Sequence, residues 1–139
     1  MTRIILIPFT FPVFEFDKSI VKIFEKIAPE LFFNLKLLFL GSNLLYEKLL
    51  EGKIEDAWIE LERIIKILLD IIDSVSREIP EPSRTFIKLF TYRTIAKLLD
   101  LKKSKLSSSE LLIQISGNLA RLIEQIFKEL ELLYKLKSR

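Results

Sequence analysis

The segment from Ile54 to Arg77 constrains the fold more than any other part of the chain. Its apolar residues recur at alternating intervals of four and three positions, which is the period of an α-helix and not of a β-strand. The main series is Ile54, Trp58, Leu61, Ile65, Leu68, Ile72 and Val75, and a second row of Ala57, Ile64 and Ile71 runs beside it. An apolar sector of this width predicts a central helix that packs against two neighbours.

Helical spacing of apolar residues continues on both sides of this segment. Asp17 stands in a capping position before a short helix that reaches Ile27, and Pro29 either ends or kinks that helix or begins the next one. The next helix should extend to about Leu50, with a kink or break where Gly41, Ser42 and Asn43 interrupt it.

Two further helices follow the central one. After the prolines at positions 80 and 82, Ser83 is the expected cap of a helix over residues 84–101 whose core residues are Phe86, Ile87, Phe90, Ile95, Leu98 and Leu99. Ser107 and Glu110 have the spacing of a capping box and open a last helix that runs nearly to the C-terminus. The sequence therefore predicts an all-α fold, a largely antiparallel bundle of about five helices.

An extended arm should precede the bundle. Residues 1–16 are rich in β-branched and aromatic residues and contain Pro8 and Pro12, so they do not suit a helix. We expect one domain over residues 1–139, with the arm at 1–16 and the bundle at 17–139. The arm either packs on its own domain or docks on a neighbouring subunit. In the second case, the candidate interface residues are Ile5, Ile7, Phe9, Phe11, Phe14 and Phe16.

The composition excludes most kinds of catalytic and metal-binding site. The chain has no cysteine and no histidine, so disulfides, thiolate zinc sites and imidazole bases are absent. Its three glycines are isolated and form no phosphate-binding loop. Acidic residues cluster at the ends of the central helix, where Asp70 and Asp73 or Glu55, Asp56 and Glu60 would serve a hard cation, but a solvated face is the simpler interpretation. We expect no enzymatic activity, no cofactor, no metal site and no small-molecule substrate.

The apolar content is high for a small domain. Half of the 139 residues are hydrophobic and mean hydropathy is +0.29, so part of the apolar surface should meet a protein partner or a second copy of the chain. The longest charge-free run, residues 4–14, is interrupted by two prolines and is too short to span a membrane. With no secretory signal either, we expect a cytoplasmic protein. Few thermolabile residues and many charges are typical of proteins from hot environments.

Charge is distributed unevenly along the chain. Residues 47–81 carry a net charge of −5, whereas residues 82–105 carry seven basic residues and one acidic residue, a net charge of +6. The basic residues are Arg84, Lys88, Arg93, Lys97, Lys102, Lys103 and Lys105. Together with Thr85, Thr91, Tyr92 and Thr94 as hydrogen-bond donors, they are candidates for contact with a nucleic-acid backbone or another phosphate. Complementary packing of an acidic helix on a basic one, or an acidic protein partner, are the alternatives.

Two loose resemblances accompany these patterns, and no diagnostic motif identifies a family. The stretch from Leu44 to Trp58 with the helix after it resembles the helix pairs of flagellin export chaperones. The size, helicity and basic strip resemble the small helical subunits of CRISPR effector complexes, which implies contact with a guide–target duplex. The leading hypothesis is a non-enzymatic assembly or interaction subunit that oligomerises or docks into a larger complex. The alternatives are a nucleic-acid backbone binder and an export chaperone or regulator.

Overall fold

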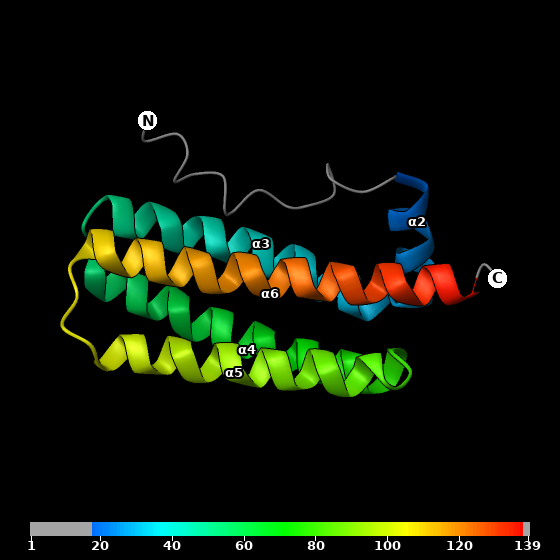
Figure 1. The fold of residues 1–139 in the computed structure, drawn as a ribbon. Helices are drawn as coiled ribbons and strands as arrows, with labels where there is room; N and C mark the ends of the chain where they lie inside the picture. Colours follow the sequence, from blue (N-terminus) through cyan, green and yellow to red (C-terminus); the bar gives the residue numbers. More distant parts are fainter. Residues whose placement is uncertain (1–17, 138–139) are drawn as a thin grey trace.

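The computed structural model describes residues 18–137 and shows an all-α bundle within this range (Figure 1). The helices are α2 (Lys18–Ile27), α3 (Pro29–Leu50), α4 (Ile54–Glu78), α5 (Ser83–Lys103) and α6 (Ser108–Lys137). Short connections make the four long helices run alternately up and down, as expected for an antiparallel bundle. The predicted arm, including the candidate interface residues Ile5, Ile7, Phe9, Phe11, Phe14 and Phe16, lies outside the described residues.

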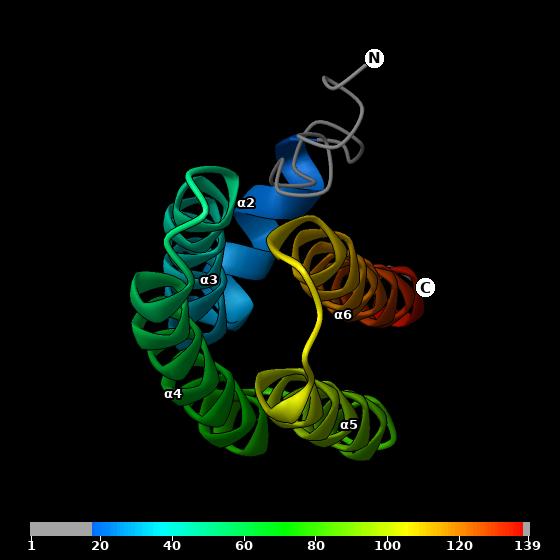
Figure 2. The same ribbon diagram turned by 90° about the vertical axis from the view of Figure 1, so that its left-hand side faces the viewer.

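The four long helices surround a common core. Viewed along the bundle, α3, α4, α5 and α6 follow one another around its axis, and α6 packs back against α3 (Figure 2). The short helix α2 packs on α3 and α6. Phe24 attaches it to the core, because its ring lies 6.2 Å from that of Phe32, which in turn meets Phe127 of α6 edge to face at 5.8 Å.

The central helix is confirmed as α4, although its most buried residues differ in part from the predicted series. Leu61, Leu68 and Val75 are fully buried, as are Ala57 and Ile64 of the second row. Trp58 and Ile65 are only partly buried at the edge of the core. The centre of the buried face therefore lies between the two predicted rows, because α4 packs against both α3 and α5.

Of the kink or break predicted in α3, the break is absent. Pro29 occupies the first turn of α3, and the helix continues without interruption through Gly41, Ser42 and Asn43. The Ser42 hydroxyl is buried and donates a hydrogen bond of 2.7 Å to the Leu38 carbonyl, so it needs no partner outside the helix. Tertiary packing overrides the low helix propensity of these residues because Gly41 and Ser42 both lie on the buried side.

Of the three predicted caps, the capping box at Ser107 is confirmed, Ser83 is wrong, and Asp17 lies outside the described residues. At the start of α6 the Glu110 N–H donates to the Ser107 hydroxyl at 3.2 Å, and the Ser107 N–H donates to the Glu110 carboxylate at 3.4 Å. Ser83, by contrast, lies inside α5, and Pro82 holds the cap position without a side-chain hydrogen bond. The Glu81 carboxylate takes over that role by accepting the Thr85 N–H at 2.8 Å.

Candidate interaction surfaces

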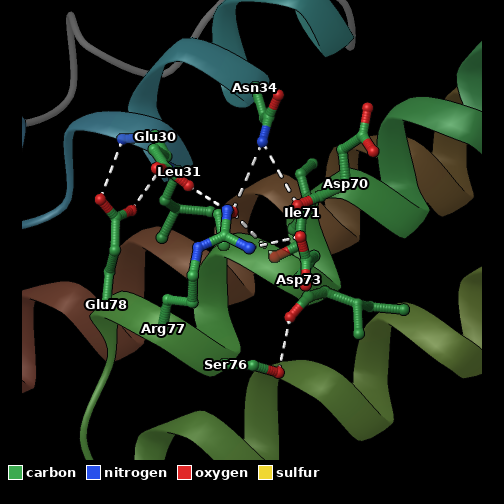
Figure 3. Close-up of polar contacts among 11 residues, drawn as sticks. Glu30, Leu31, Asn34, Asp70, Ile71, Asp73, Ser76, Arg77 and Glu78 are labelled. Atoms are coloured by element: carbon green, nitrogen blue, oxygen red, sulfur yellow. Dashed lines mark hydrogen bonds and ion pairs between the residues drawn. The ribbon is translucent and has the colours of Figure 1, made fainter.

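A polar cluster joins the end of α4 to the start of α3 (Figure 3). Ala28 stands at the cap position of α3 and has no side chain that accepts a hydrogen bond. The Glu78 carboxylate replaces it from α4, because it accepts the N–H groups of Glu30 at 3.1 Å and Leu31 at 2.8 Å. A carboxylate at a helix N-terminus also interacts favourably with the helix dipole. Glu78 is therefore a cap supplied from a distant part of the chain.

The same cluster holds a guanidinium between two carboxylates. Arg77 forms ion pairs with Glu30 of α3 and Asp73 of α4, and the hydrogen bonds that it donates to both carboxylates raise the pKa of Arg77 above its ordinary value (Figure 3). Asn34 adds a hydrogen bond of 3.3 Å to the Asp70 carbonyl. These residues line a shallow hollow, but the charge of Arg77 is already balanced, so the hollow does not form an anion site. We conclude that the cluster stabilises the contact between α3 and α4.

The acidic residues considered for a metal ion do not converge. Within residues 18–137, no group of three acidic side chains is arranged to hold a metal ion. The Asp70 and Asp73 side chains are exposed on α4, and Asp73 binds Arg77. Glu60 is 8% exposed, accepts a hydrogen bond of 2.9 Å from Arg63 through Oε1, and has no partner for Oε2 in the described part of the chain. Its burial was missed because Glu60 and Arg63 have the spacing of a surface ion pair.

The basic residues of α5 lie on two sides of the helix. Lys102 points toward α4 and binds Glu62 there at 2.7 Å, which holds the pKa of the Glu62 carboxyl below its ordinary value. Lys97 lines a hollow on the side of α6, together with Arg121. At about 100° per residue, Lys88 falls on the α4 side with Lys102, and Arg93 falls on the α6 side with Lys97. Within α5, Lys88 and Lys102 thus lie on one flank and Arg93 and Lys97 on the opposite flank, while Lys105 lies beyond the end of the helix.

Most of these cations have no carboxylate partner among the described residues. Of Arg84, Lys88, Arg93, Lys97, Lys102, Lys103 and Lys105, only Lys102 forms an ion pair there. The Arg84 guanidinium is used locally, since Nε donates to the Ile79 carbonyl at 2.8 Å. The ion pair between α4 and α5 therefore neutralises only Lys102 of this set. The other basic residues give the surface a net positive charge.

Two of the proposed hydrogen-bond donors are buried. The side chains of Thr91 and Thr94 face the core, and their hydroxyls donate to the carbonyls of Ile87 at 2.7 Å and Phe90 at 3.0 Å. Their prediction as donors to an outside phosphate is wrong, because no ligand on the surface would reach them. Thr85 and Tyr92 are on the exposed side, but the Thr85 hydroxyl donates to the Glu81 carboxylate at 2.6 Å.

The outward face of α5 carries apolar side chains, whereas Thr91 and Thr94 face the core. Phe86 and Leu99 were predicted in the core but are 48% and 43% exposed. Leu89 and Tyr92 are 58% and 51% exposed, and Ala96 is also exposed. We call Phe86, Leu89, Tyr92, Ala96 and Leu99 the α5 stripe. The sequence did not reveal it because α5 carries apolar residues on both of its sides, and the pattern alone does not say which side faces the core.

A second apolar surface runs along the outside of α3. Phe33, Leu37, Leu40 and Leu44 follow one another at intervals of four, three and four, so they share one helix face. Phe33 is 62% exposed, Leu40 57% and Leu44 45%, while Leu37 is half-buried. We call these four residues the α3 stripe. The opposite side of α3 is also apolar because it packs in the core, so this helix is apolar on nearly all sides.

Comparison of the chain with protein-family models, with curated proteins and with solved structures finds no match. No helix among residues 18–137 is long and apolar enough to cross a bilayer. The α3 stripe, the α5 stripe and the cations beside the α5 stripe are the candidate interaction surfaces of the described residues.

Proposed function

We propose that this chain is a non-enzymatic helical subunit that self-associates, or docks into a larger complex, through the outward face of α3. The observation that supports this proposal is the α3 stripe. Exposed apolar side chains on a monomer are usually scattered, whereas these four form a continuous row along more than three helical turns. The intervals are those of a helix seam, which a second helix can fill by packing its own side chains between them.

The α3 stripe also differs from the surfaces around it in charge. No charged residue interrupts the series between Phe33 and Leu44 on this face, and Lys36 and Glu47 lie at its edge. An apolar centre with charged residues at the rim is the usual anatomy of an interface between subunits. Burial of the stripe on association would remove its apolar surface from water, which is the dominant favourable term in such contacts.

Light scattering coupled to size-exclusion chromatography tests the proposal. The wild-type chain should elute with a mass above that of the 16.3 kDa monomer at micromolar concentration. Leu40→Glu should reduce it to a monomer, because a charge would be buried in the contact. Leu50→Glu is the matched control, since Leu50 is on the same helix and 58% exposed but lies outside the stripe.

A wild-type chain that stays monomeric to about 100 μM would rule out self-association, because a specific interface should bind more tightly than that. Docking into a larger complex would then require a host protein that wild type and Leu50→Glu capture and Leu40→Glu does not. Deletion of residues 1–16 in a parallel sample separates a contribution of the arm from that of α3.

A further inference from the structure

The outward face of α5 combines an apolar centre with cations on both flanks. Leu89, Tyr92 and Leu99 of the α5 stripe are about half exposed. Lys88 borders them on the side of α4, and Arg93 and Lys97 border them on the side of α6. Asp100, the one acidic residue in α5, lines the hollow on the α6 side together with Lys97 and Arg121. This arrangement differs from the α3 stripe, which has few cations at its edges, so the two faces should contact different surfaces.

The shape of this face decides between several anionic partners. The exposed side chains of the α5 stripe form a ridge along the outward face of the helix, and the hollow next to it is lined mainly by polar residues, among them Lys97, Asp100 and Arg121. A partner helix can pack on an exposed helix face, as proposed for the α3 stripe, but on α5 it would also need acidic residues on both sides of its apolar seam to face Lys88 and Arg93. A nucleic-acid backbone needs cations together on one surface, whereas here an apolar row separates them. A lipid surface is deformable and accommodates a ridge.

We propose that α5 binds the surface of an anionic lipid bilayer. Phe86, Leu89 and Leu99 would enter the boundary between headgroups and acyl chains, and Tyr92 would stay at headgroup depth, where tyrosine is enriched in membrane proteins. Lys88, Arg93 and Lys97 would contact anionic headgroups on either side while their stems lie along the apolar ridge. The helix would lie in the plane of the interface and remain part of the bundle.

The expected strength follows from the cations and the exposed apolar area. Each basic residue close to an anionic surface raises partitioning roughly fivefold at physiological salt. Neutralising three of them should therefore weaken binding roughly a hundredfold. The apolar side chains supply the part of the binding that salt does not screen, so removal of Leu89 and Leu99 should weaken binding at both low and high salt.

Co-sedimentation with vesicles tests the proposal, using the full-length chain. Wild type should sediment with vesicles of phosphatidylglycerol and phosphatidylcholine in equal parts and remain in solution with pure phosphatidylcholine vesicles. Lys88→Gln/Arg93→Gln/Lys97→Gln and, separately, Leu89→Ser/Leu99→Ser should each lose binding to the anionic vesicles. Two matched controls should retain it: Lys66→Gln on the outside of α4, and Ile113→Ser, which replaces a 57% exposed side chain of α6.

All the substituted side chains are exposed or half-buried, so the variants should fold, and circular dichroism checks this directly. If the triple variant does not fold, the Leu89→Ser/Leu99→Ser variant and a salt titration of wild type still decide the question. Equal binding of wild type and both α5 variants would overturn the proposal, and so would binding to neither type of vesicle. Binding of an oligonucleotide that is lost in the triple variant, without vesicle binding, would overturn it in favour of a nucleic-acid backbone.

This inference is independent of the proposed self-association. Leu40→Glu should still sediment with the anionic vesicles, because each protomer carries its own α5 face and the α3 stripe lies on a different helix of the bundle. Loss of vesicle binding in Leu40→Glu alone would show that the anionic surface contacts α3, which would also overturn the assignment to α5.

Discussion

Replacing Glu78 with alanine should destabilise the bundle at the first turn of α3. The substitution removes the carboxylate that accepts the N–H groups of Glu30 and Leu31, at 3.1 and 2.8 Å. Ala28 cannot replace it as a cap. Two N–H groups at the start of a long helix would then depend on water, and Leu31 is fully buried.

The magnitude follows from helix capping. Loss of a capping side chain typically costs about 1 kcal/mol, within a range of about 0.5–2. The negative charge at a helix N-terminus adds about 0.3–1 kcal/mol. The substitution also has a smaller effect in the opposite direction. Glu78 is the last residue of α4, where a negative charge is unfavourable, so removal of the charge stabilises the end of that helix. We expect a net loss of about 1–2 kcal/mol, which for a chain of 139 residues lowers Tm by about 3–7 °C.

Equilibrium unfolding in urea measures this loss, with Trp58 as the fluorescence probe because it is the single tryptophan and lies partly buried on α4. Protein concentration must be held fixed, since self-association contributes to apparent stability. Glu78→Gln keeps one acceptor oxygen and should cost about half as much. Glu47→Ala removes an exposed carboxylate from the other end of α3 and should change stability by less than about 0.5 kcal/mol. If Glu78→Ala proved as stable as Glu47→Ala, the capping argument would be refuted.

Two further predictions concern the core and the pH dependence. Leu68→Ala should cost about 2–5 kcal/mol because the side chain is fully buried, whereas Leu69→Ala, at the next position and 48% exposed, should cost less than about 1 kcal/mol; equal urea midpoints for the two variants would contradict the burial of α4. Lys102 lowers the pKa of the Glu62 carboxyl from its ordinary value of 4.5, so the Glu62–Lys102 pair stabilises the fold above that pH and loses its effect as pH falls below it. Glu62→Gln should therefore flatten the decline of the urea midpoint between neutral and acidic pH, and an unchanged decline would show that the pair does not contribute.

The number and order of the helices could be predicted from the sequence because local signals mark them. The spacing in α4, the proline at the start of α3 and the capping box at Ser107 and Glu110 are all set by neighbouring residues. Such patterns act through the period of the helix and through backbone groups within one turn, so they can be recognised without knowledge of tertiary contacts.

The capping of α3 by Glu78 could not be predicted, because the two partners are separated by 47 or 48 positions in the chain. The orientation of α5 was not predictable for a different reason. Thr91 satisfies its own hydroxyl with the Ile87 carbonyl and can be buried at little cost, which leaves Phe86 and Leu89 for the outside. Hydrophobicity alone would place Phe86 and Leu89 in the core and Thr91 on the surface.

The apolar character of α3 on nearly all of its sides has a consequence for biosynthesis. The ribosome delivers this helix before α4, α5 and α6, so the nascent chain up to Leu50 carries buried-type side chains such as Leu35 and Leu38 with nothing yet to cover them. Aggregation is a danger whenever such surface is transiently exposed. Packing of α4 on α3 ends the first part of this interval, so variants that weaken the contact between these two helices should lower the expression yield.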